Sequence, residues 1–256
     1  MTNKFYITHL YPKELSIYGD QGNILTIQHT LKQIGWDYIY QTVEIGESLP
    51  VQNDFLFIGG GQDRDQAKIV DDLLTHKKEL QQLVNNGMAV LAICGGYQLF
   101  GYEFIDSTGE IMPGLEIFPV ITRSPDAEVK SRCIGNLLIE SPIIGCKLVG
   151  FENHGGQTYF INDEAQELGK VIKGYGNNFS QKTEGCVYKN AVGTYLHGSC
   201  LPKNPELTMW LINQVAEVKK AKDEIGVGLY YMIKQAKVDT QIALAAKNYM
   251  IQRMVN

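Results

Sequence analysis

The segment that most constrains the fold of this chain runs from Ala89 to Gly101 and reads AVLAICGGYQLFG. An apolar stretch of strand length leads directly into Cys94, which is followed by two glycines and an apolar segment compatible with a helix. A strand, a sharp turn bearing a nucleophile, and a helix form a nucleophile elbow, here with cysteine in place of serine. The small neighbours admit a substrate, and the start of the helix favours a thiolate. The alternative is a structural cysteine buried beside a glycine turn.

Length and composition indicate a globular protein and give no reason to expect nucleic acid or a membrane as its partner. The chain has 256 residues, of which 44% are hydrophobic and 20% charged, with a net charge of -5. No apolar run is long enough to span a membrane, and nothing near the N-terminus resembles a signal peptide. The five cysteines are scattered without a CxxC pair, so we expect no disulfide framework and no metal site. A reduced, cytoplasmic protein is therefore predicted.

The first half of the chain alternates between strand and helix patterns. Sites in such folds lie beyond the carboxyl ends of the strands, and both Gly59–Gly61 and Cys94 occupy such ends. The alternation predicts an α/β fold with a mainly parallel central sheet and helices on both faces. The predicted strands are 4–10, 38–45, 54–58 and 89–93, and the predicted helices are 24–34, ended by Gly35, and 64–85.

The second half has short strand patterns between glycine-rich turns, which predicts an added antiparallel section. We interpret residues 1–256 as a single domain, with a core over about 5–211 and a C-terminal helical extension over about 212–256. The apolar stripe of the last helix is expected to pack onto the domain, although a docking surface for a partner chain remains open. The stripe consists of Val238, Ile242, Ala245 and Tyr249. The predicted strands are 114–122, 135–140, 147–151, 169–174 and 186–196, and the predicted helices are 204–218 and 238–254.

A catalytic thiol needs a base, and two of the five histidines lie in glycine-flanked segments. His154 belongs to GFENHGG, and His197 ends the strand-like GTYLHG. A strand that delivers histidine into a glycine turn holds the ring rigidly but leaves it accessible, as a general base requires. Spacing alone leaves both histidines open.

The ordered set of motifs resembles the class I glutamine amidotransferases, whose elbow reads G-x-C-x-G-x-Q, with Ala92 replacing the first glycine here. The segments IGGGQDRDQ, GFENHGG, GYGNN and GTYLHG look like the cobyric-acid-synthase-type branch. More narrowly, they are similar to the glutaminase subunits of bacterial lipid II isoglutaminyl synthases. The resemblance runs from about residue 5 to residue 211 and implies a three-layer α/β fold. It also favours His197 over His154 as the base.

The resemblance implies a thioester mechanism on L-glutamine. Cys94 would attack the side-chain amide, His197 would protonate the departing ammonia, and the N–H groups of Gly60 and Gly95 would form the oxyanion hole. Two further residues match substrate-binding positions and end the implied set. They are Gln98 and Arg132, whose guanidinium suits an α-carboxylate. The alternative for Gln98 is a helix residue that only orders the elbow, and the alternative for Arg132 is a solvated surface charge.

One position departs from the pattern of many class I enzymes. A carboxylate two residues after the histidine completes their triad, whereas Ser199 stands there in this chain. Glu152 and Glu206 are possible internal substitutes. The resemblance implies instead that a partner ligase subunit supplies the acid.

The acceptor half of the reaction is expected on another polypeptide. No G-x-x-x-x-G-K-[ST] loop occurs, so we expect no cofactor in this chain and place ATP and Mg²⁺ on the partner. The resemblance implies a heterodimer with a MurT-like Mur ligase subunit that amidates D-glutamate of lipid II to D-isoglutamine in peptidoglycan biosynthesis. The alternatives are a glutaminase serving a corrinoid-type cofactor synthetase, a DJ-1-like or peptidase-like cysteine protein, and a catalytically inactive binding module.

Overall fold

The computed structural model of the chain describes residues 4–106, 108–124 and 132–255. Its centre is a six-stranded sheet with the order β13-β14-β4-β3-β1-β2, in which every neighbouring pair is parallel except β13 with β14. The predicted, mainly parallel sheet is therefore confirmed. Its strands are β1 (Phe5–Leu10), β2 (Tyr38–Val43), β3 (Phe55–Ile58), β4 (Ala89–Ile93), β13 (Cys186–Tyr188) and β14 (Ala191–Thr194).

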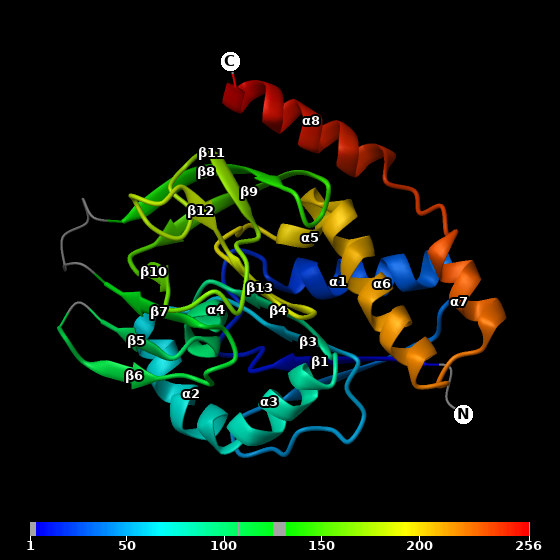
Figure 1. Cartoon of the computed structure of the whole chain (residues 1–256), viewed down its shortest axis with the longest axis horizontal. Coiled ribbons are helices and arrows are strands. Elements are labelled where there is room, and N and C mark those ends of the chain that lie inside the picture. The colour runs from blue at the N-terminus through cyan, green and yellow to red at the C-terminus, as the bar shows by residue number, and fades with distance from the viewer. Residues whose placement is uncertain (1–3, 107, 125–131, 256) are drawn as a thin grey trace.

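Helices cover both faces of this sheet, as predicted. Figure 1 shows α1 (Gln21–Ile34) and α6 (Pro205–Ala221) on one side, and α2 (Asp63–Thr75) and α3 (Lys77–Asn85) on the other. The central strands β3 and β4 are apolar along their whole length and fully buried, because a parallel sheet covered on both faces leaves no strand face in water. Gly35 ends α1 in the left-handed conformation, with φ 78°.

Two four-stranded sheets follow β4 in sequence and precede β13. The first has the order β10-β7-β5-β6 and contains one parallel pair, β5 with β7, while the second has the order β12-β11-β8-β9 and is antiparallel. The predicted antiparallel section is thus present as two sheets. Their strands are β5 (Glu103–Ile105), β6 (Ile111–Pro113), β7 (Val120–Arg123), β10 (Gln157–Phe160), β8 (Cys133–Ser141), β9 (Cys146–His154), β11 (Gly169–Lys173) and β12 (Thr183–Glu184).

Three segments differ from their predicted form. The helix predicted over 64–85 is two helices, because the His76 N–H bonds to the Leu73 carbonyl three residues back and ends α2. The strand predicted over 186–196 is the hairpin β13–β14, which turns at Lys189 in a left-handed conformation. Of the strand predicted over 114–122, only the last part forms β7. The chain also forms α7 (Val227–Lys234), which was not predicted because glycine both precedes it and is its second residue.

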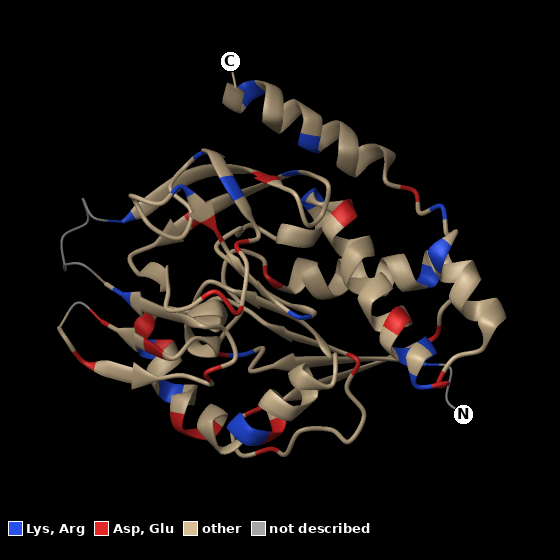
Figure 2. Ribbon diagram, viewed as in Figure 1, with Lys and Arg blue, Asp and Glu red and all other residues tan. Residues whose placement is uncertain are grey.

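The C-terminal helix α8 (Gln241–Val255) lies against β8, β9 and the short helix α5 (Cys200–Lys203). Of its predicted apolar stripe, Val238 lies before α8 and packs against the core, whereas Ile242 (85% exposed), Ala245 and Tyr249 (61% exposed) face solvent, so within the helix the expectation that the stripe packs onto the domain is wrong. The buried side instead presents Met254 to the second small sheet and Lys247 to Glu206, at 2.7 Å. A lysine can lie inward because its stem packs while its ammonium finds a carboxylate. Figure 2 shows how few charges α8 carries.

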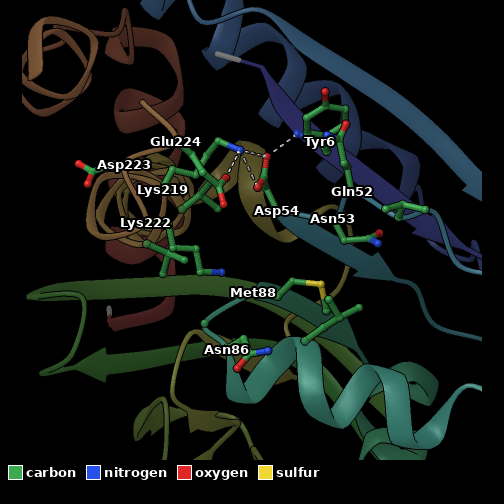
Figure 3. Close-up of a pocket in the computed structure, with 15 residues that line it drawn as sticks. Tyr6, Gln52, Asn53, Asp54, Asn86, Met88, Lys219, Lys222, Asp223 and Glu224 are labelled. Atoms are coloured by element: carbon green, nitrogen blue, oxygen red, sulfur yellow. Dashed lines mark hydrogen bonds and ion pairs between the residues drawn. The ribbon is translucent and has the colours of Figure 1, made fainter. Parts of the chain in front are cut away.

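The cavity in Figure 3 lies at the amino ends of β1, β3 and β4, opposite the ends that carry the predicted site, and measures about 540 Å³. The buried Lys219 ammonium of α6 contacts both oxygens of Asp54 at 3.0 Å and Glu224 at 3.1 Å. Asp54 also accepts the Tyr6 N–H at 2.9 Å. Because each of these charges is paired, we interpret the cluster as a structural ion-pair network that connects α6 to the sheet.

The C-terminal limit of the core predicted at residue 211 falls inside α6, and the single-domain interpretation stays a prediction. No helix among the described residues is both long and apolar enough to cross a membrane.

Candidate active site

Cys94 lies on the predicted elbow between β4 and α4 (Gly95–Phe100). Its backbone has φ 50° and ψ −103°, a conformation that costs a non-glycine residue energy and occurs often at functional sites. The Cys94 N–H donates to the Thr194 carbonyl of β14 at 2.9 Å, which holds the turn against the neighbouring strand. A Cβ on Gly96 would lie 2.8 Å from the Ile58 side chain, so glycine is required where the elbow passes β3. The elbow borders a pocket of about 700 Å³.

His197 follows β14, the strand beside β4. Its N–H donates to the Phe151 carbonyl of β9 at 2.7 Å and its carbonyl accepts the Phe151 N–H at 3.3 Å, so the backbone position is fixed from two sheets. A Cβ on Gly60 would lie 3.0 Å from His197 Cε1 and 3.3 Å from Cys94 Cβ. The predicted nucleophile and the predicted base therefore meet beside the glycine loop.

Both ring nitrogens of His197 are buried and lack a hydrogen-bond partner among the residues that the structure describes. The Tyr18 ring meets the imidazole edge-on, with 5.2 Å between centroids. Burial lowers the pKa of His197 to about 3, and His154 and Lys203 act in the same direction. The imidazole is therefore neutral at pH 7.

Burial raises the pKa of the Cys94 thiol to about 12, and the nearby Asp20 carboxylate adds to this effect. The neighbouring Gly95 N–H opposes this rise in the pKa. In the isolated chain the pair is thus a neutral thiol with a neutral imidazole rather than an ion pair. A bound substrate or a further charge has to change this balance before the thiol can react as a thiolate.

His154, the alternative base, is held in another role. Its ring stacks on Tyr195 with 3.6 Å between centroids and an interplanar angle of 8°, and Nδ1 contacts the Gly156 carbonyl at 2.7 Å. With Nδ1 as the donor, the imidazole holds this turn while it lines the pocket.

Neither internal glutamate is placed to complete a triad. Glu152 accepts the N–H groups of Tyr175 and Gly176 at 2.8 and 2.9 Å. Glu206 binds the Lys247 ammonium. Ser199, at the position of the missing carboxylate, donates to the Gly19 carbonyl and so joins the turn after His197 to the turn before α1.

The glycine loop after β3 presents a different N–H group from the one predicted. The Gly60 N–H donates to Asp20 Oδ2 at 2.7 Å, so it is engaged and not free for an oxyanion. Gly61 lines the Cys94 pocket, and a Cβ on Gly95 would lie 3.1 Å from the Gly61 nitrogen. The geometry therefore favours Gly61 with Gly95 as the pair of oxyanion donors.

Gln98 lies one turn along α4 with both ends of its amide hydrogen-bonded. Its oxygen accepts from Gln66 at 3.0 Å and its nitrogen donates to the Tyr195 hydroxyl at 3.3 Å. Although Gln98 lines the pocket, these bonds favour its role in ordering the elbow over direct substrate binding.

Two opposite charges flank the same pocket. Arg132 is exposed and donates to the Asn153 side chain at 3.0 Å, while Asp63 is the first residue of α2. Burial raises the pKa of Asp63, and the Arg132 guanidinium opposes this rise. A carboxylate and a guanidinium beside one thiol match the two charges of a free amino acid.

The roles of Asp20, Gly61 and Asp63 were not predicted. Asp20 and Asp63 lie in the turn GDQG and the run GGGQD, which sequence reading treats as turn and helix start. Only the contact between the two segments shows that they share a site.

Comparison with known proteins shows the family to which the chain belongs. Residues 6–205 match the model of the CobB/CobQ-like glutamine amidotransferase domain. The chain is 38% identical over 250 residues to a Staphylococcus aureus protein named lipid II isoglutaminyl synthase (glutamine-hydrolyzing) subunit GatD, covering 96% of this chain and 95% of that one. It is 35% identical over 218 residues to the Streptococcus pneumoniae protein of the same name, covering 85% and 82%.

Solved structures show the same architecture. A crystal structure of a glutamine amidotransferase superposes with a TM-score of 0.55 at 14% identity, covering 81% of this chain and 98% of the other. At that identity the likeness bears on the fold alone, and it confirms the predicted three-layer class.

Proposed function

Because the chain belongs to the CobB/CobQ-like glutamine amidotransferase family, we propose that it hydrolyses L-glutamine at Cys94 and supplies ammonia to a separate ligase subunit. The observation that supports this most is the convergence of Cys94 and His197 at Gly60, next to a pocket that Cys94 and Gly61 line. Each group needed for acyl transfer to a thiol is present there, apart from an acid behind the imidazole.

The proposed reaction begins when the Cys94 sulfur attacks the side-chain amide carbon of glutamine and the thiol proton passes to His197. The N–H groups of Gly61 and Gly95 stabilise the tetrahedral oxyanion. The imidazolium then protonates the leaving nitrogen, which departs as ammonia and leaves a glutamyl thioester on Cys94. Water, deprotonated by His197, cleaves the thioester and releases glutamate with the thiol restored.

The charges beside the pocket support glutamine as the substrate. We assign Arg132 to the α-carboxylate and Asp63 to the α-ammonium group. A zwitterion held at both charges would place its side-chain amide toward the thiol.

The unpaired imidazole supports completion of the site by a partner chain. A carboxylate from that chain beside His197 would stabilise the imidazolium, which no glutamate considered above does. We infer that the partner is a MurT-like Mur ligase subunit that binds ATP and Mg²⁺ and amidates D-glutamate of lipid II to D-isoglutamine. The names of the two relatives, each matched over more than four fifths of its length, support this acceptor.

The test is glutamate release from L-glutamine by the purified chain, with and without the co-expressed Mur-ligase-like subunit. We expect release that rises with the partner and is lost in Cys94→Ala. The matched control is Cys146→Ala, which removes a partly buried cysteine that does not line the pocket and should keep activity. No release by the folded chain in either state would contradict the glutaminase assignment. Stimulation by a corrinoid-type synthetase instead of the Mur-like subunit would contradict the acceptor.

A further inference from the structure

Asp20 makes a contact that its position in the sequence does not explain. It precedes α1 at the position where aspartate usually caps a helix, yet its side chain makes no capping hydrogen bond. The carboxylate is fully buried and instead accepts the Gly60 N–H at 2.7 Å, from a loop 40 residues away. Asp20 therefore acts on the glycine loop rather than on its own helix.

The glycine loop is held closely on several sides. A Cβ on Gly59 would lie 2.3 Å from the Leu15 carbonyl oxygen and 3.0 Å from Asp20 Oδ2. The Gly60 carbonyl accepts the Ile17 N–H at 3.4 Å. Both polar groups of Gly60 are thus directed toward the turn before α1. Since Gly60 is turned that way, the next nitrogen, that of Gly61, lies toward Gly95 and the pocket.

We propose that Asp20 is a positioning residue for the oxyanion hole: by holding the Gly60 N–H, it leaves the Gly61 N–H beside that of Gly95 to receive the oxyanion. The proposal rests on the proposed glutaminase function. It assigns Asp20 no contact with substrate, so its effect should fall on the chemical step rather than on substrate binding.

The charge of Asp20 has a second consequence above about pH 7, where the group is ionised, because burial raises the pKa of Asp20 to about 7. Asp20 Oδ1 has no hydrogen-bond partner within the described ranges, and the carboxylate opposes ionisation of the Cys94 thiol. Arg132 and Asp63 also act on that thiol, with opposite signs, and His197 is neutral. Removing the charge of Asp20 should therefore ease thiolate formation, while removing its acceptor oxygen should slow catalysis.

Two variants separate these effects in the full chain co-expressed with the ligase subunit. Asp20→Asn keeps an acceptor oxygen and loses the charge, whereas Asp20→Ala loses both. Asp72→Asn is the matched control, because Asp72 also accepts a loop glycine N–H, that of Gly46 at 2.8 Å, but does not line the Cys94 pocket. The readouts are kcat and KM for glutamine, the pH midpoint of Cys94 alkylation by iodoacetamide, and thermal unfolding.

For Asp20→Ala we expect kcat to fall about 100-fold, the usual effect of losing one oxyanion donor, with KM nearly unchanged. Asp20→Asn should restore most of kcat. Both variants should move the alkylation midpoint to lower pH, and the control should change neither readout. Wild-type kcat in Asp20→Ala, or an unmoved midpoint in Asp20→Asn, would overturn the proposal.

The alkylation midpoint keeps this test separate from the proposed function. If the wild-type complex releases no glutamate, the glutaminase assignment fails, while the midpoints still report whether Asp20 acts on the Cys94 site. If Asp20→Ala does not fold, Asp20→Leu decides the matter: it keeps the size of the side chain without an acceptor for the Gly60 N–H, so kcat should fall as for Asp20→Ala, and an unaltered kcat overturns the proposal.

Discussion

Three residues of the site have a positive φ, which is costly for residues other than glycine. Tyr18, Cys94 and Ser199 have φ values of 53°, 50° and 49°. They come from three different segments, and each lies beside the imidazole of His197 or in the segments that hold it. Strain concentrated around one ring indicates that the surrounding packing, rather than local preference, sets the geometry there.

At the same scale, the assignment of Asp63 to the α-ammonium group can be tested with a substrate that lacks it. Asp63→Asn should raise KM for L-glutamine about tenfold, because a charged hydrogen bond contributes about 1.4 kcal/mol. The same change should leave KM for glutaramate, which has no α-amino group, nearly unaltered. Steady-state ammonia release measures both values.

The control for this experiment is Asp65→Asn, on the same turn of α2 but paired with Lys68 at 2.9 Å and outside the pocket lining. Equal effects of Asp63→Asn on the two substrates would contradict the assignment.

Among the elements, α4 and β14 form the support under the nucleophile. The Tyr97 ring of α4 lies directly over Gly193 of β14, where a Cβ would be 2.1 Å from the ring. Both residues are fully buried, so the elbow helix approaches the strand as closely as a glycine backbone allows.

Gly193→Ala should therefore destabilise the chain by about 3 kcal/mol, since neither the ring nor the strand can move freely. Gly228→Ala is the matched control, because nothing lies within 4 Å of the added Cβ in α7. It should stabilise the chain by about 0.7 kcal/mol through higher helix propensity. Urea denaturation measures both changes, and equal effects would contradict this account of the packing.

The orientation of α8 allows a second comparison between positions of one helix. Ile242→Ser should change the free energy of unfolding by less than about 0.5 kcal/mol, because the side chain is largely in water. Met254→Ala should cost about 2 kcal/mol, because Met254 packs on Leu138 and Val149. Thermal unfolding of the two variants tests the orientation, and the reverse order of effects would show that the helix is rotated.

The strands of the central sheet and the elbow could be predicted because each corresponds to one short apolar segment of the sequence. The orientation of α8 could not, since apolar residues occur both on its predicted stripe and on its buried side, and the buried side also carries Lys247, whose inward position depends on Glu206. The site divides in the same way. Cys94 and His197 lie in distinctive local motifs, whereas the role of Asp20 exists only through its contact with Gly60.

For the whole molecule, the decisive feature is that both small sheets lie between β4 and β14, which are parallel neighbours. The pairing of β14 with β4 closes the long connection over residues 94–190. Contacts between residues so far apart in sequence form slowly, because the closure of a long loop costs entropy before the contact is made. The thiol and the imidazole should therefore meet late in folding.

Refolding from urea should show this order. Far-UV circular dichroism should recover before Cys94 is protected from a short pulse of iodoacetamide, because protection requires the complete pocket. Cys186 of β13, buried away from the pocket, serves as a reference cysteine in the same pulses. Protection of Cys94 together with the first helical signal would show that the site is assembled early.

The order of assembly also affects when the Cys94 thiol can be oxidised. Burial raises the pKa of the Cys94 thiol to about 12, whereas an unfolded cysteine ionises near its ordinary value of about 8.5. During synthesis, Cys94 emerges long before the segment that carries His197. The unfinished chain consequently exposes an ordinary thiol that oxidants can reach, and only the completed fold shields it until a substrate enters.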